Sequence, residues 1–154
     1  MKRVAYIIPG YGESHLRQSS YNKVAKLFET KGILPIHVDI NWGNKKQKRF
    51  GDYTDQFLKV YKKQRGVEEY VLGFSFGAVI AFLTAKQIKP KVLILCSLSP
   101  YFKDDLKDLK PAWVKWWRNN FIDSDYSFTK IAPEINSKTY IVVGDKESKN
   151  CLNR

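Results

Sequence analysis

The chain has 154 residues, of which 44% are hydrophobic and 14% aromatic, and this composition predicts one globular domain over residues 1–154 with a substantial core. Its formal net charge of +12 would suit a nucleic acid, an anionic membrane surface or an acidic substrate, but only residues 45–49 form a dense basic run. The two cysteines, Cys96 and Cys151, form neither a disulfide framework nor a metal-ligand spacing, so we expect no metal and no other cofactor.

The apolar run near the N-terminus, residues 4–8, stops at Pro9 and Gly10. It is too short for a signal sequence and far too short to cross a membrane. Together with the cysteine usage, this run predicts a cytoplasmic protein without a transmembrane segment.

Apolar and β-branched segments alternate with stretches that have helical periodicity. Strands are predicted over residues 3–8, 34–40, 70–72, 92–96 and 139–143, and Pro35 favours an edge position for the second. Helices are predicted from Ser19 or Ser20, from Phe50, and over residues 78–83, where every side of the helix is apolar. This alternation predicts an α/β fold with a doubly wound parallel sheet of about five strands. In such a sheet the functional residues lie on loops at the carboxyl ends of the strands.

The segment 69–83 carries the strongest motif. A short apolar strand runs into Gly73-Phe74-Ser75-Phe76-Gly77 and then directly into an apolar helix. A strand that turns into a helix within two or three residues needs glycine where the two backbones nearly touch, and the apex serine is then exposed at the helix N-terminus. This is the G-x-S-x-G nucleophile elbow. The alternative is a glycine-rich turn with an ordinary serine.

The chain resembles the α/β-hydrolases, most of all their small esterase-like members, and three motifs carry the resemblance. The first is the G-x-S-x-G segment at residues 73–77. The second is the loop at residues 9–12, which is similar to the family's H-G-x-G oxyanion loop with Pro9 in place of the usual histidine. The third is the turn at residues 144–147, which is similar to the G-x-x-D turn that presents the catalytic acid.

The resemblance implies a role for each matching residue. Ser75 would be the nucleophile, and the backbone N–H groups of Phe76 and Tyr11 would stabilise the oxyanion. Glu147 falls where the family's acid usually stands, and Asp145 is the competing candidate; spacing alone does not separate them.

The general base is the missing part of the triad. In this family a histidine follows the acid after one further strand, but this sequence ends at Arg154 and its two histidines are His15 and His37. His37 falls in a predicted strand, whereas His15 is in the oxyanion loop. We therefore expect the chain to be a truncated form of a longer hydrolase or a shortened relative without activity, and to turn over esters very slowly.

An insertion at about residues 98–137 occupies the position of the family's lid and is rich in aromatic residues. Pro111 fits the start of a helix, and Trp113, Trp116 and Trp117 follow at helical spacing. These tryptophans either pack the lid onto the sheet or line an apolar acyl pocket. The residues expected around the substrate are Gly10, His15, Phe74, Trp113 and Trp117.

Three classes of function follow from these patterns. The first is a serine hydrolase that cleaves a small carboxylic ester or thioester, with an anionic or acyl substrate favoured by the basic run and the aromatic lid. The second is a non-catalytic hydrolase-like binding protein or inactive fragment, favoured by the missing histidine. The third, a nucleic-acid-binding protein, has no recognition motif to support it, and we do not expect a nucleic-acid partner. The sequence makes no prediction of the oligomeric state.

Overall fold

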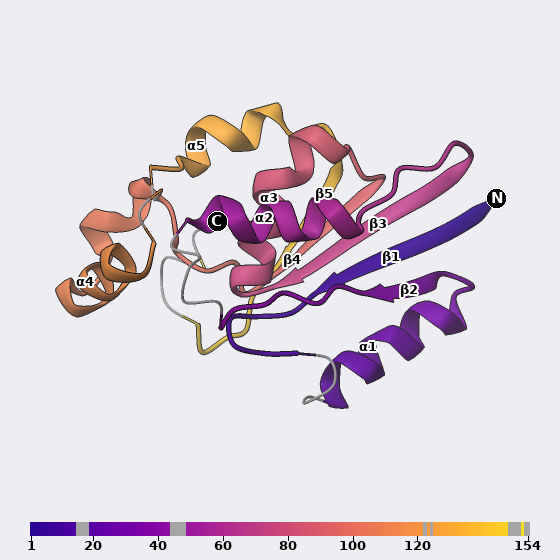
Figure 1. Cartoon of the computed structure of the whole chain (residues 1–154), viewed down its shortest axis with the longest axis horizontal. Coiled ribbons are helices and arrows are strands. Elements are labelled where there is room, and N and C mark those ends of the chain that lie inside the picture. Colours follow the sequence, from indigo (N-terminus) through magenta and orange to yellow (C-terminus); the bar gives the residue numbers. More distant parts are fainter. Residues whose placement is uncertain (15–18, 44–48, 122, 124, 148–151, 153–154) are drawn as a thin grey trace.

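The computed structural model describes residues 1–14, 19–43, 49–121, 123, 125–147 and 152. Five strands form one parallel sheet in the order β2-β1-β3-β4-β5 (Figure 1). The strands are β1 (Lys2–Ile8), β2 (Leu34–His37), β3 (Val67–Phe74), β4 (Val92–Cys96) and β5 (Lys138–Val142). The strands β2 and β3 pair with opposite edges of β1, so the strand order reverses direction at β1. The predicted doubly wound sheet of five strands is therefore confirmed.

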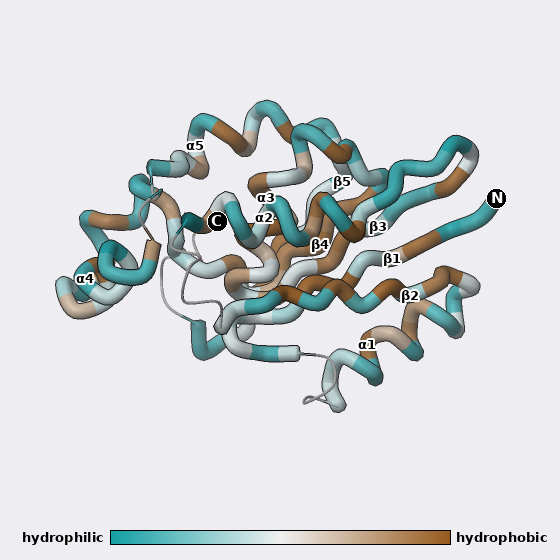
Figure 2. Tube along the Cα trace, in the orientation of Figure 1, coloured by the Kyte–Doolittle hydropathy of each residue, from teal (hydrophilic) through white to brown (hydrophobic). Residues whose placement is uncertain are grey.

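Helices cover both faces of this sheet. The three helices between strands are α1 (Ser19–Thr30), α2 (Phe50–Val60) and α3 (Phe76–Ile88). Because side chains alternate along a strand, Tyr6 and Val71 join the large core that α2 and α3 cover, whereas Ile7 and Leu72 pack with Tyr21 of α1 on the opposite face. Figure 2 shows that hydrophobic residues concentrate on the central strands.

The second strand is shorter than predicted. It ends at His37 instead of residue 40, although Val38 and Ile40 are buried where the chain leaves the sheet. Its partner β1 ends at Ile8, and the next residue, Pro9, has no N–H to continue the ladder. The edge position is confirmed, because β2 pairs with β1 at one end of the sheet.

Helix α3 is apolar on nearly every side and packs against β3, β4 and β1, next to α2 on the same face of the sheet. It extends beyond the predicted residues 78–83 in both directions and starts directly after Ser75. Among the described residues, none of the helices combines the length and the apolar character needed to cross a bilayer.

Between β4 and β5, the described residues form the short helices η1 (Lys103–Asp108), α4 (Pro111–Asn120), α5 (Phe128–Ile131) and η2 (Ala132–Glu134). Several contacts attach this segment to the rest of the molecule, and two of them involve α2 and α3. The Asp123 carboxylate accepts a hydrogen bond of 2.9 Å from the Gly51 N–H and another from the Phe50 N–H, at the N-terminus of α2. The Phe128 ring stacks on Phe82 of α3 with 5.0 Å between centroids.

Candidate active site

The backbone between β3 and α3 turns sharply at Ser75. Its φ of 52° and ψ of −117° are values that residues other than glycine rarely adopt. The turn requires both glycines beside it. A Cβ on Gly73 would lie 2.3 Å from the Gly77 carbonyl oxygen, and one on Gly77 would lie 2.3 Å from the Pro9 carbonyl oxygen. The backbone thus passes from β3 through a tight turn into α3, with Ser75 at the apex of the turn.

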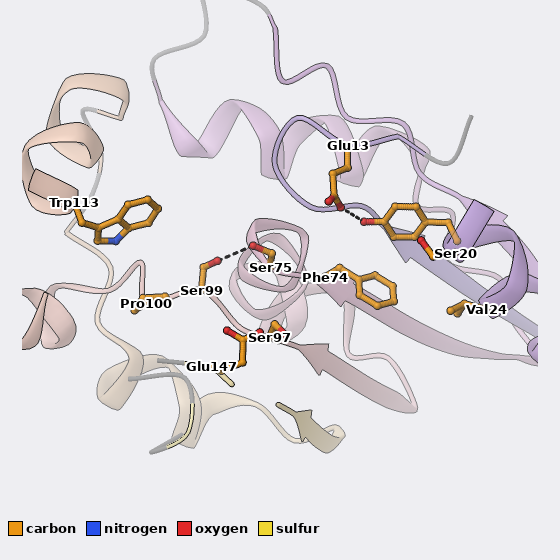
Figure 3. Close-up of a pocket in the computed structure, with 11 residues that line it drawn as sticks. Glu13, Ser20, Val24, Phe74, Ser75, Ser97, Ser99, Pro100, Trp113 and Glu147 are labelled. Atoms are coloured by element: carbon orange, nitrogen blue, oxygen red, sulfur yellow. Dashed lines mark hydrogen bonds between the residues drawn. The ribbon is translucent and has the colours of Figure 1, made fainter. Parts of the chain in front are cut away.

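The N–H and the hydroxyl of Ser75 are both hydrogen-bonded to the end of β4 and the loop after it. Its N–H donates to the carbonyl oxygen of Cys96 at 2.9 Å, which ties the turn to the end of β4. Its hydroxyl oxygen lies 2.9 Å from that of Ser99, and Ser99 is only 8% exposed (Figure 3). The Ser75 hydroxyl is thus partly accessible and oriented by a buried neighbour.

Ser75 lines a pocket of about 520 Å³. Because the carboxyl ends of parallel strands meet at one edge, the loops after β1, β3, β4 and β5 all contribute to this pocket, together with α1 and α4. The lining residues are Glu13, Ser20, Tyr21, Val24, Phe74, Ser75, Ser97, Ser99, Pro100, Trp113 and Glu147. Figure 3 shows Glu13 and Glu147 on opposite sides of Ser75, and Trp113 beside Pro100. The lining described here has two carboxylates and no lysine or arginine.

The structure distinguishes the positions of the two acid candidates. Glu147 is half-buried and lines the pocket with Ser75, whereas Asp145 is exposed and does not line it. The turn that brings Glu147 inward is closed by a hydrogen bond of 3.2 Å from its N–H to the Gly144 carbonyl oxygen.

The two residues predicted to bind the oxyanion through their N–H groups are Phe76, next to Ser75 in the chain, and Tyr11, which follows Gly10 in the loop after β1. Phe76 is the first residue of α3, where a backbone N–H has no intrahelical partner. Tyr11 follows Gly10, and a Cβ on Gly10 would lie 3.5 Å from the Ser75 Cβ. The Tyr11 ring is 38% exposed and packs against aromatic rings that include Trp42 and Trp116.

The predicted substrate-pocket residues lie in different surroundings. Phe74 and Trp113 line the pocket, and Trp113 stacks on Trp116 with 4.8 Å between centroids. Trp117 is not among the lining residues: it is 1% exposed and packs 4.7 Å from the Tyr101 ring. Trp113 and Trp117 are four residues apart, but Trp117 faces the core.

The described pocket lining contains neither of the two histidines. His37 ends β2 and does not line the pocket, and His15 lies outside the described residues. Most of the basic run, residues 45–48, also lies outside them. Within the described ranges, no three His, Cys, Asp or Glu side chains are grouped as they would be around a metal ion.

Sequence reasoning missed five polar residues of the pocket: Glu13, Ser20, Tyr21, Ser97 and Ser99. Three of them follow the carboxyl ends of β1 and β4, so the rule for parallel sheets had pointed to their loops without selecting them. Ser97, like Ser75, has a positive φ, of 49°. Tyr21 belongs to the buried stripe of α1, where its aromatic ring indicates packing and not a place in the pocket.

Comparison with known proteins identifies the fold. Neither a protein-family model nor a curated protein sequence matches the chain. The chain does, however, match several solved structures. The chain is similar to the alpha/beta hydrolase domain-containing protein 10 from mouse, with a TM-score of 0.60 and 12% identity over 97% of this chain and 85% of that one. It is also similar to Est1E from Butyrivibrio proteoclasticus, solved with ferulic acid bound, with a TM-score of 0.59 and 14% identity over 93% and 80%.

The fold is that of the α/β-hydrolases. A third similar structure is a thermostable carboxyl esterase from Bacillus coagulans in complex with glycerol, with a TM-score of 0.56 and 19% identity over 77% of this chain. This chain spans 42% of the length of that esterase. The sequence-based resemblance to the α/β-hydrolases is thereby confirmed at the level of the fold. The roles assigned to individual residues remain predictions.

Proposed function

We propose that the protein is a serine hydrolase that cleaves small carboxylic esters or thioesters, with Ser75 as the nucleophile on a nucleophile elbow. The observation that carries the proposal is the backbone of Ser75, with a φ of 52° at the N-terminus of α3 and a hydroxyl in a pocket at the carboxyl edge of the sheet. Strain of this kind is kept where the surrounding structure holds it and a function uses it.

The proposed chemistry is acyl transfer. The Ser75 hydroxyl oxygen attacks the carbonyl carbon, its proton passes to a general base, and the carbonyl oxygen becomes an oxyanion that the N–H groups of Phe76 and Tyr11 stabilise. The C–O or C–S bond to the leaving group then breaks, and water releases the acyl group. The described pocket lining contains no histidine for the base, so the nucleophile and the complete reaction need separate tests.

The pocket lining supports an uncharged, partly apolar substrate. Phe74, Val24, Pro100 and Trp113 supply apolar walls, and the two carboxylates would repel an anionic ester. The indole N–H of Trp113 is buried and has no hydrogen-bond partner within the described residues. In this proposal the residues after β4 and before β5 form a lid over Ser75.

The test is covalent labelling with a fluorophosphonate, whose phosphorus centre is more electrophilic than an ester carbonyl. We expect stoichiometric labelling on Ser75, located by peptide mass spectrometry, and none in Ser75→Ala. Ser97→Ala is the matched control, because Ser97 lines the same pocket with a similar positive φ, and it should label as the wild type does. In parallel, 4-nitrophenyl acetate should be hydrolysed at least about 10⁴-fold more slowly than by an esterase with a complete triad. Labelling at another serine, or none, would contradict the proposal.

A second function is a binding protein with the hydrolase fold that does not turn over its ligand. The absence of histidine from the described pocket lining favours it. Under this alternative, neutral esters protect the pocket from chemical modification or raise the melting temperature, yet Ser75 stays unlabelled after prolonged exposure to the fluorophosphonate.

The acid is predicted to be Glu147. Because Glu147 lines the pocket and Asp145 is exposed, Glu147→Gln should slow fluorophosphonate labelling by about 10-fold or more. Asp145→Asn is its matched control, changing the same charge two residues away, and should leave the labelling rate within about twofold. The reverse ranking of the two rates would assign the role to Asp145.

A further inference from the structure

The loop after β1 is a tight turn closed by its own backbone. The Glu13 N–H donates to the Gly10 carbonyl oxygen at 3.1 Å, and Gly12, at the third position, has a φ of 73°. A hydrogen bond from the fourth residue to the first and a positive φ at the third position are typical of a type II β-turn. The Tyr11 N–H is not part of this closing hydrogen bond, so the turn leaves it available for another acceptor.

A single hydroxyl group from α1 joins both ends of that turn. The Tyr21 hydroxyl donates to the Glu13 carboxylate and accepts a hydrogen bond of 3.0 Å from the Gly10 N–H. Tyr21 is 4% exposed, and its ring packs edge-on against Phe74 with 5.2 Å between centroids. Burial and the carboxylate bond raise the pKa of Tyr21 well above its usual value, so the hydroxyl keeps the proton that it donates.

This bridge lies beside Ser75. A Cβ on Gly10 would be 2.7 Å from the Glu13 carboxylate oxygen and 3.5 Å from the Ser75 Cβ. The side chains of Glu13 and Ser75 therefore both lie close to Gly10. Glu13, Tyr21 and Ser75 also line the same pocket. The Gly10 and Glu13 N–H groups are already hydrogen-bonded, so those of Tyr11 and Gly12 remain for an oxyanion formed at Ser75, and the Tyr11 N–H is the one that directly follows Gly10.

We infer that Tyr21 and Glu13 are positioning residues: together they clamp the turn at residues 10–13 so that the Tyr11 N–H stays directed at the oxyanion formed on attack by Ser75. The effect of the clamp on the reaction rests on the proposed function. The clamp itself consists of hydrogen bonds within the chain and does not depend on that function. Neither side chain touches the reacting atoms.

Tyr21→Phe in the full chain is the direct test, because phenylalanine keeps the ring on Phe74 and removes both hydrogen bonds. Loss of one oxyanion donor typically lowers a rate by about 10²–10³-fold, and a displaced donor should lower the maximal rate of Ser75 labelling by about 10-fold or more. The fluorophosphonate concentration that gives half of that maximal rate should change little, because the phenylalanine ring keeps the shape of the pocket wall and only one hydroxyl group is lost.

The structure offers a matched control in Tyr61→Phe. Tyr61 also donates to a glutamate, Glu69, at 2.7 Å, and it does not line the pocket. This variant should lower the melting temperature about as much as Tyr21→Phe and leave the labelling rate unchanged. Glu13→Gln keeps an acceptor for the Tyr21 hydroxyl and should label nearly as fast as the wild type, whereas Glu13→Ala should resemble Tyr21→Phe.

Amide hydrogen exchange of Gly10 and Glu13, whose N–H groups are hydrogen-bonded in the clamped turn, provides a readout that does not depend on the reactivity of Ser75. Faster exchange in Tyr21→Phe, with no change at these amides in Tyr61→Phe, supports the clamp. Unchanged exchange, or a wild-type labelling rate in Tyr21→Phe, overturns it. If the wild type is never labelled but exchange is faster in Tyr21→Phe, the proposed function fails and the clamp stands.

Discussion

Gly77→Ala is expected to lower the free energy of unfolding by more than about 3 kcal/mol. The added Cβ would lie 2.3 Å from the Pro9 carbonyl oxygen and 2.5 Å from that of Ile8. Both atoms belong to the backbone at the end of β1, so no side chain can rotate to make room. Relief of the clash would move α3 away from β1, and such a movement would also displace the turn at Ser75.

Urea unfolding followed by circular dichroism measures this effect, with Gly43→Ala as the control. Gly43 is exposed, and a Cβ there would meet a single atom, the Asn41 side-chain oxygen, at 3.8 Å. The control should change the free energy of unfolding by less than about 0.5 kcal/mol. A Gly77→Ala protein as stable as the control would show that α3 does not approach β1 as closely as described.

Trp117→Ala is expected to cost about 3–5 kcal/mol of stability, the usual range for removing a large buried aromatic side chain. Trp117 is 1% exposed and packs on Tyr101, and α4 has no other fully buried residue in the described structure. Its removal would leave a cavity between the helical segment and the main core. The midpoint of urea denaturation is the measurement.

Trp113→Ala is the comparison, because Trp113 is on the same helix but lines the pocket. We expect it to cost less than about 2 kcal/mol, since this side chain is partly exposed. It should instead alter the preference of Ser75 between short and long alkyl fluorophosphonates. An unchanged preference in Trp113→Ala, or a changed one in a folded Trp117→Leu protein, would reverse the roles assigned to the two tryptophans.

Local chemistry was enough to predict the elements and the turn at Ser75. Residues 73–77 carry glycine at the two positions where a strand and a helix nearly touch, and this requirement is met within five consecutive residues. The edge strand with Pro35 and the helix starting at Pro111 follow from similarly local signals. The end of β2 was predicted too late, because the strand length depends on where its partner β1 stops.

The amino-acid sequence by itself thus determined a doubly wound α/β sheet with a strained serine between β3 and α3, because these features depend on neighbours in the chain. Only the tertiary structure decided which residues surround that serine. Ser99 contacts Ser75 from 24 positions away, and Tyr21 reaches the turn at Gly10 from α1. Trp113 and Trp117 share one helix, yet one lines the pocket and the other fills the core. Such contacts depend on how strands are ordered and how helices are rotated against them, and residue spacing along one segment contains no information about either.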